Sequence, residues 1–128
     1  MPLYVAQFVI VEEDIWFSEI NYREVIRREE ASRYVHCLVF AAPDSEAAYV
    51  WAAGNVDCMN DANCDGLGDQ TRYTGLGLQQ LSELSLDADD MLRELREDGS
   101  IEVAVVAGPP IIRPREELDL FKYVRLFD

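Results

Sequence analysis

Residues 3–11, LYVAQFVIV, limit the possible folds of this chain more than any other segment. Successive side chains of a strand point to opposite faces, and here both faces are predominantly apolar. A strand of this kind is buried on two sides, so we predict that it lies in the centre of a sheet. The runs at 33–42 and 100–108 are also apolar and rich in β-branched residues, and they are predicted to be further buried strands.

The length and composition fit one globular domain over residues 1–128. A chain of 128 residues is long enough for one core and too short for two. Hydrophobic residues make up 49% of it, which is enough apolar surface to drive folding in spite of a formal net charge of −14. The sequence contains no internal repeat and no linker, so we predict a single domain.

Two helices are predicted from the signals at their ends. The first lies within 43–55, where Asp44 is a good N-cap and Trp51 is expected to pack on the sheet. The second covers 87–98, with acidic residues in its first turn and a glycine after its end. A partial helix is also expected within 14–32, where irregular structure competes with it.

The rest of the chain is assigned to a connection, a strand and a tail. The segment 54–71 is rich in glycine and aspartate and is predicted to be a long connection. A strand follows at 72–84, in which Gly75 and Gly77 leave room for another backbone or a bulky ring to approach. The tail at 114–128 is compatible with a helix or with an edge strand. The order of the elements predicts an α+β fold, with a mixed or antiparallel sheet of four to five strands and two to three helices packed mainly on one face.

Four segments follow a pattern of strands and an alanine-rich helix that is known from one protein family. They are YVAQFVIV, LVFAAPDSEAAYVWA, RYTGLGLQQLSEL and DGSIEV. In these segments the chain resembles the bacterial domain of unknown function 4288 family, and it departs from the family pattern in the long insert at 14–32 and after Pro109. The resemblance implies an α+β architecture and no activity, because the family has no assigned chemistry.

The acidity of the chain restricts its partners. The sequence holds 25 acidic and 11 basic residues, and such a surface repels nucleic-acid phosphates and anionic membrane surfaces. The charge favours a basic protein as the partner, because complementary fields accelerate association. The alternative is that the acidity only keeps the protein soluble.

The sequence also predicts a cytoplasmic location. The first residues, MPLYVAQFVIVEED, lack the positive leader and the cleavage site of a secretory signal, and no apolar run is long enough to span a bilayer. The cysteines are Cys37, Cys58 and Cys64, and this odd number argues against a disulfide framework.

The segment NDANCDGLGD at 60–69 is similar to the first half of a calcium-binding loop. Its alternating candidate ligands are Asp61, Asn63, Asp65 and Asp69. The position that should supply the last, bidentate carboxylate is Arg72, and a guanidinium there repels the cation. A calcium-responsive module is therefore an alternative function, and a polar surface turn without metal is the simpler interpretation.

Two acidic segments are predicted to contact a basic partner. Their candidate contact residues are Asp57, Asp61, Asp65 and Asp69 in the 57–69 loop and Asp89, Asp90 and Glu94 in the second helix. Immunity proteins that neutralise nuclease toxins place carboxylates in the electropositive cleft meant for nucleic acid. We therefore predict an immunity-type inhibitor of a basic bacterial toxin or nuclease, with Trp16 and Tyr22 as candidate aromatic anchors.

Catalytic sites find little support in the sequence. His36 and Cys37 are adjacent, so on a strand they point to opposite faces and cannot act as base and nucleophile. A zinc site made from His36, Cys58 and Cys64 lacks the usual closely spaced pairs of ligands. No phosphate-binding motif is present, and no pair of carboxylates stands out in an apolar setting, so we do not expect an enzyme. A small enzyme with a carboxylate site is kept as a further alternative.

Overall fold

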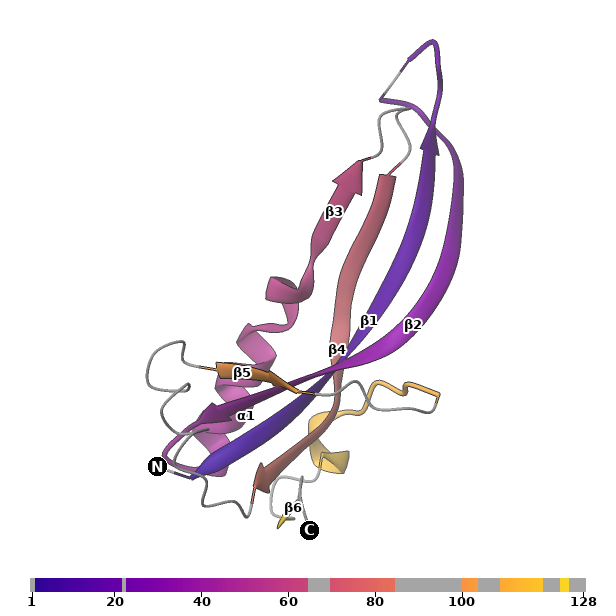
Figure 1. Ribbon diagram of the computed structural model, residues 1–128. Helices are drawn as coiled ribbons and strands as arrows, with labels where there is room; N and C mark the ends of the chain where they lie inside the picture. Colours follow the sequence, from indigo (N-terminus) through magenta and orange to yellow (C-terminus); the bar gives the residue numbers. More distant parts are fainter. Residues whose placement is uncertain are drawn as a thin grey trace.

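A computed structural model of the chain (Figure 1) describes residues 2–21, 23–64, 70–84, 100–103, 109–118 and 123–124. Three long strands dominate it, and they are β1 (Leu3–Phe17), β2 (Val25–Ala41) and β4 (Gln70–Leu84). β1 lies between the other two and pairs antiparallel with both. The prediction of a central strand at 3–11 is therefore confirmed, and this strand continues to Phe17.

Three short strands complete the sheet. β3 (Asp61–Cys64) pairs antiparallel with β4, and β5 (Ser100–Val103) pairs antiparallel with β2, which gives the order β3-β4-β1-β2-β5. β6 (Tyr123–Val124) pairs with the end of β4 as a parallel strand. The strand predicted at 100–108 is thus present in its first four residues, and β6 favours the edge-strand interpretation for the second half of the tail.

Helical structure is limited in the part of the chain that the structure describes. α1 (Ser45–Gly54) is an α-helix, whereas η1 (Val56–Met59) and η2 (Arg115–Glu117) are short 3-10 helices. The helix predicted at 87–98 lies outside the described residues. The predicted α+β class with two to three helices is wrong, because the described structure is mostly sheet, with three long antiparallel strands and one α-helix. None of these described helices has the length and apolar character needed to cross a membrane.

The partial helix expected within 14–32 is replaced by the far end of a β-hairpin. β1 and β2 both continue into this segment, and a hydrogen bond from Ser18 N to Glu24 O (2.8 Å) closes the turn between them. Arginine, glutamate and alanine are good helix formers, but intrinsic propensity is small in energy, so pairing with β1 overrides their local preference. Residues 25–33 of β2 are all exposed, which explains why no hydrophobic alternation marks this strand in the sequence.

α1 forms as its capping signal predicts. The Asp44 carboxylate accepts a hydrogen bond from Ala47 N (2.7 Å) and so satisfies one of the N–H groups that the first turn leaves without a partner. Trp51 packs on the sheet as expected, because its ring stacks on Phe40 with the two centroids 4.0 Å apart.

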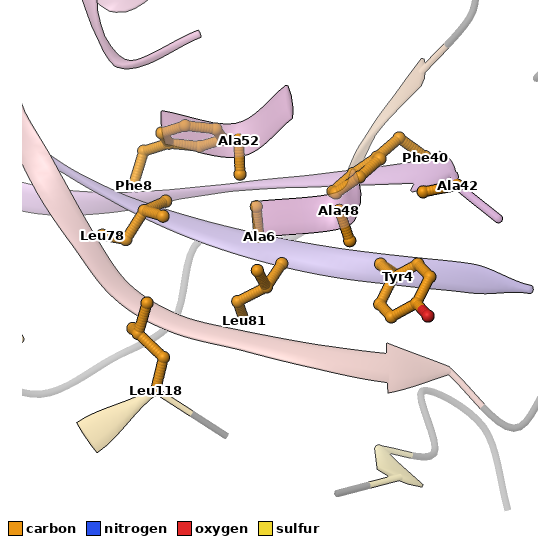
Figure 2. Packing of buried hydrophobic residues seen from close by; sticks show 10 residues of the cluster. All are labelled: Tyr4, Ala6, Phe8, Phe40, Ala42, Ala48, Ala52, Leu78, Leu81 and Leu118. Carbon is orange, nitrogen blue, oxygen red and sulfur yellow. The ribbon is translucent and has the colours of Figure 1, made fainter. Parts of the chain in front are cut away.

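The core lies between α1 and one face of the sheet, where Ala48 and Ala52 of the helix meet larger side chains of the strands (Figure 2). This buried cluster consists of Tyr4, Ala6, Phe8, Phe40, Ala42, Ala48, Ala52, Leu78, Leu81 and Leu118. Its members on β1 are even-numbered, so the even-numbered residues of β1 mark the side of the sheet that carries α1, which we call the α1 face. Val5 and Val9 on the opposite face are also buried, as expected for a strand covered on two sides.

α1 covers only one end of this face (Figure 1). The long strands and β3 extend beyond the core cluster towards the tip of the hairpin between β1 and β2. We call this part the distal end of the sheet, and it comprises residues 12–17, 25–33, 61–64 and 70–74.

Candidate functional site

The strand register sorts the charged residues of the distal end between the two faces of the sheet. Directly paired residues of neighbouring strands share a face, so the charged residues can be assigned from their partners on β1. The α1 face carries Glu12, Asp14, Arg27, Glu29 and Asp61. The opposite face carries Glu13, Arg28, Glu30, Arg33 and Arg72. Among the described residues the α1 face is therefore strongly acidic at this end, whereas the opposite face is slightly basic, and we call Glu12, Asp14, Glu29 and Asp61 the acidic face.

Among the described residues, Arg27 is the one base on this side, and it is not paired with Glu12 or Asp14. Arg27 is bound to Glu29 at 2.9 Å, and its guanidinium also lies over a tryptophan ring. Glu12 and Asp14 form no ion pair with any residue that the structure describes. Asp14 instead accepts a hydrogen bond from the Thr71 hydroxyl (3.3 Å). Hydroxyl donors hold these carboxylates in place without cancelling their negative charge.

Four side chains form a row across four strands of the acidic face. Asp61 of β3 is paired with Tyr73 of β4, Tyr73 with Glu12 of β1, and Glu12 with Ser32 of β2. The Tyr73 hydroxyl donates to one Glu12 carboxylate oxygen (3.1 Å), and the Ser32 hydroxyl donates to the other (3.0 Å). Both neighbours thus fix the orientation of the Glu12 carboxylate at the centre of the row.

The ionisation of the tyrosines on this face follows from the same contacts. The hydrogen bond to Glu12 raises the pKa of Tyr73 above its usual 10.0, and the negative charges of Glu12 and Asp61 raise it further. Burial raises the pKa of Tyr34, with a smaller contribution from the charge of Glu12. Both phenols therefore stay neutral at physiological pH, so the negative charge of the site is carried by its carboxylates.

A hollow of about 350 Å³ opens beside this row. The hollow lies at the next position on the same face of β1, two residues before Glu12. There Ile10 of β1 is flanked by Tyr34 of β2 and by Gly75 of β4. On the Gly75 side, η1 packs against the strand, because its Val56 carbonyl oxygen takes the place that a side chain would fill. The hollow is lined by Ile10, Tyr34, His36, Cys58, Met59, Asn60, Asp61 and Tyr73, and we call it the tyrosine hollow.

The same glycine positions the wall formed by η1. A Cβ atom at Gly75 would overlap the carbonyl oxygen of Val56 and would lie 3.2 Å from Met59 Cβ. The Gly75 N–H also donates to the Asn60 side-chain oxygen (2.8 Å), which ties the end of η1 to β4. The prediction that another backbone approaches this strand at a glycine is confirmed here. At Gly77 a Cβ atom would lie 2.9 Å from a side-chain carbon of the 109–118 segment.

The two tyrosines give the hollow an aromatic lining. Their rings meet edge to face, with centroids 6.5 Å apart and an interplanar angle of 75°. Tyr34 and Tyr73 are half-buried, so part of each ring remains accessible. A second hollow of about 480 Å³ shares Asn60, Asp61 and Tyr73 with the first and extends it along β3 and β4. Aromatic faces next to a carboxylate attract cations, so the arrangement favours binding of a positive group.

The structure brings together only part of the predicted contact residues. Asp57 in η1 and Asp61 in β3 are exposed, and both lie in the segment next to the tyrosine hollow. The remaining predicted contacts lie outside the described residues, and they are Asp65, Asp69, Asp89, Asp90 and Glu94. Of the two proposed aromatic anchors, Trp16 is half-buried beneath Arg27, whose guanidinium carbon is 4.7 Å from the ring centroid, and Tyr22 lies outside the described residues.

The segment compared with a calcium loop is partly a strand. Asp61 and Asn63 lie in β3, and Arg72 lies opposite Ala62 in the neighbouring β4. The other two candidate ligands, Asp65 and Asp69, lie outside the described residues. Within the described part of the chain, no three histidine, cysteine or acidic side chains come close enough to hold a metal ion.

Sequence reasoning did not find the residues at the centre of the site. Glu12, Tyr34 and Tyr73 come from three different strands and share no motif. His36 and Cys58 were considered together as zinc ligands and set aside, yet both line the tyrosine hollow. The one local signal was the glycine pair in β4, which predicted a close approach but not what lies beside it.

In comparisons with protein-family models, with curated proteins and with solved structures, no match to this chain was found. The site is therefore interpreted from its own residues and their geometry.

Proposed function

We propose that this chain is a cytoplasmic protein-binding domain that recognises a basic protein through the acidic face of its sheet. Its most concrete form is an immunity-type inhibitor of a basic bacterial toxin or nuclease. Membership in the domain of unknown function 4288 family is likewise a proposal, and it contributes no activity. The observation that carries the proposed function is the concentration of Glu12, Asp14, Glu29 and Asp61 on one side of the distal end.

The division of charge between the two faces supports recognition more strongly than the net charge does. Acidity that only prevented aggregation would not need to favour one face of the same strands. Here Glu12 and Glu13 are neighbours in the sequence and point to opposite faces, yet among the described residues of the distal end only the face of Glu12 is strongly acidic. A one-sided field steers a basic partner to that side and fixes its orientation.

The tyrosine hollow supplies an aromatic centre for the interface, which surface charge alone does not provide. Interfaces draw most of their affinity from a few central aromatic or arginine residues in desolvated pockets, and charges at the rim contribute mainly to the rate of association. Tyr34 and Tyr73 provide such a centre within the acidic face. The mechanism would be occlusion, in which carboxylates occupy the basic surface that the partner uses for nucleic acid, without any catalysis.

The test is capture from the lysate of the native host at low salt, with variants of equal charge. The first variant combines Glu12→Gln with Asp61→Asn, which removes two charges from the acidic face and keeps side-chain size. The matched control combines Glu116→Gln with Glu117→Gln, because both residues are exposed on η2 and line neither hollow. Thermal unfolding of each variant verifies that it is folded.

We expect wild type and control to retain one basic protein that the acidic-face variant loses. The retained protein is then purified, and its nuclease or toxic activity is measured with and without this chain. Inhibition by the wild type, and none by the acidic-face variant, is the predicted result. Capture of nothing, or equal capture by all three forms, would overturn the proposal. The acidity would then serve only to keep the protein soluble.

A further inference from the structure

We propose that the tyrosine hollow is a subsite for a single arginine side chain of the partner. The inference rests on the proposed function and makes it more specific, because it names the group that enters the centre of the acidic face. The observation behind it is the placement of Tyr34 and Tyr73 around Ile10, with the Asp61 carboxylate in the lining of the hollow.

The size and lining of the hollow suit one long side chain. A volume of about 350 Å³ is near the lower end of the range for ligand sites, and one long side chain fits within it. Ile10 at its floor and Met59 in its wall are apolar and can cover the methylene stem of an arginine. Because the two tyrosine rings stand at 75° to each other, one of them can then stack on the planar guanidinium, which is attracted to an aromatic ring within about 6 Å of its centroid.

The polar groups around the hollow are those that a guanidinium needs. Asp61 and Tyr73 line it, and the Tyr73 hydroxyl binds the carboxylate of Glu12, which stands next to the hollow in the same row. Tyr73 uses its proton to bind Glu12, so its oxygen is left as an acceptor towards a ligand. A cation entering here gains hydrogen bonds to oxygen atoms and the field of two carboxylates.

The chain itself stacks guanidinium groups on aromatic rings in two other places. Arg27 lies over Trp16 at 4.7 Å, and Arg115 lies over Tyr49 at 4.3 Å from guanidinium carbon to ring centroid. In both cases a glutamate binds the same arginine. The tyrosine hollow presents the same combination of ring and carboxylate, and no described arginine lies over its rings.

An arginine fits this combination better than a lysine. The guanidinium is planar, so it can stack on a ring while its N–H groups reach acceptors in the plane. A lysine ammonium is compact and strongly hydrated, and it would lose more hydration for fewer directed contacts in a half-open hollow. The inference therefore predicts selectivity between two groups of equal charge.

The experiment is an NMR titration of the whole chain with acetyl-arginine-amide, up to about 10 mM at low salt. Acetyl-citrulline-amide has nearly the same shape without charge, and acetyl-lysine-amide has the charge without the planar group. We expect saturable shifts at Tyr34, Tyr73 and Met59 with the arginine probe, weaker ones with lysine and none with citrulline. Uniform weak shifts over all acidic residues, or lysine binding as tightly as arginine, would overturn the inference.

Variants locate the binding and separate the inference from the proposed function. Glu12→Gln should weaken arginine binding by up to about fivefold, the effect of one partly exposed charge, whereas Glu117→Gln should leave it unchanged. Tyr34→Leu keeps bulk over Ile10 and should abolish the selectivity for arginine over lysine. If the chain captures a basic partner that depends on the acidic face, while arginine binds outside the hollow or not at all, the proposed function stands and the arginine subsite is rejected.

Discussion

Replacing Gly75 with alanine tests how the site is built. Gly75 lies in β4 beneath η1, and a Cβ atom there would overlap the carbonyl oxygen of Val56. That oxygen belongs to the backbone, so it cannot rotate away as a flexible side chain could. Either η1 or β4 must move, and the hydrogen bond from Gly75 N to the Asn60 side chain (2.8 Å) is then stretched or lost.

The expected loss of stability has two parts. Overpacking one methyl group into a filled position costs about 1–3 kcal/mol, and losing one hydrogen bond costs about 1 kcal/mol. Gly75→Ala should therefore reduce the free energy of unfolding by roughly 2–4 kcal/mol, a large share of the roughly 5–15 kcal/mol of an ordinary domain. Because η1 forms one wall of the tyrosine hollow, arginine binding should weaken in the same variant.

The measurement is urea unfolding followed by tryptophan fluorescence, with Gly54→Ala as the control. Gly54 ends α1, and a Cβ atom there would have no neighbour within 4 Å. Removing a helix glycine at such an open position should stabilise the chain by up to about 1 kcal/mol. The reasoning is refuted if both alanine variants change stability equally, or if Gly75→Ala lies within about 0.5 kcal/mol of wild type.

Three further predictions concern the cap, the core and the tyrosines of the site. Asp44→Ala removes the N-cap of α1 and should cost about 1 kcal/mol in urea unfolding, whereas Asp44→Asn should cost much less. Leu81→Ala empties a fully buried position and should cost about 2–5 kcal/mol, and a loss below 1 kcal/mol would contradict the described core. Since the pKa of Tyr73 is raised in the folded chain, its stabilising contribution is complete below pH 10 and is lost as the pH rises through the higher folded value. Tyr73→Phe should therefore lose less stability than wild type between about pH 9 and about pH 11, and equal losses would count against its contact with Glu12.

Elements with strong local signals were predictable from the sequence. The run at 3–11 is apolar on both faces because β1 is central and buried on two sides. The first helix was predictable because Asp44 and the alanines after it favour the same structure through capping and propensity. In both cases the local preference and the tertiary environment agree, which is the condition under which sequence patterns are reliable.

The segment 14–32 was mispredicted because its strand carries no hydrophobic alternation. Residues 25–33 expose both faces, so nothing in their polarity distinguishes a strand from a helix or a loop. Their pairing partner on β1 is itself polar at Glu12, Glu13 and Asp14. What determines this structure is continuation of a hairpin that starts in the core, and that information is not local.

The calcium-loop pattern shows how one spacing can fit two structures. Ligands at the first, third and fifth positions of a calcium loop are two residues apart, and side chains on one face of a strand are also two residues apart. Asp61 and Asn63 satisfy both descriptions, and the structure places them in β3. The tyrosine hollow could not be predicted at all, because it requires the register of four strands to bring its residues together.

The central claim is that the acidic face binds a basic partner by charge complementarity. The most direct test is calorimetric titration of the captured partner against wild type and the Glu12→Gln, Asp61→Asn double variant, at about 50 mM and about 300 mM salt. We predict that wild type binds more tightly at low salt, and that the variant loses both affinity and much of this salt dependence. Identical affinities and salt dependence for the two forms would contradict the account.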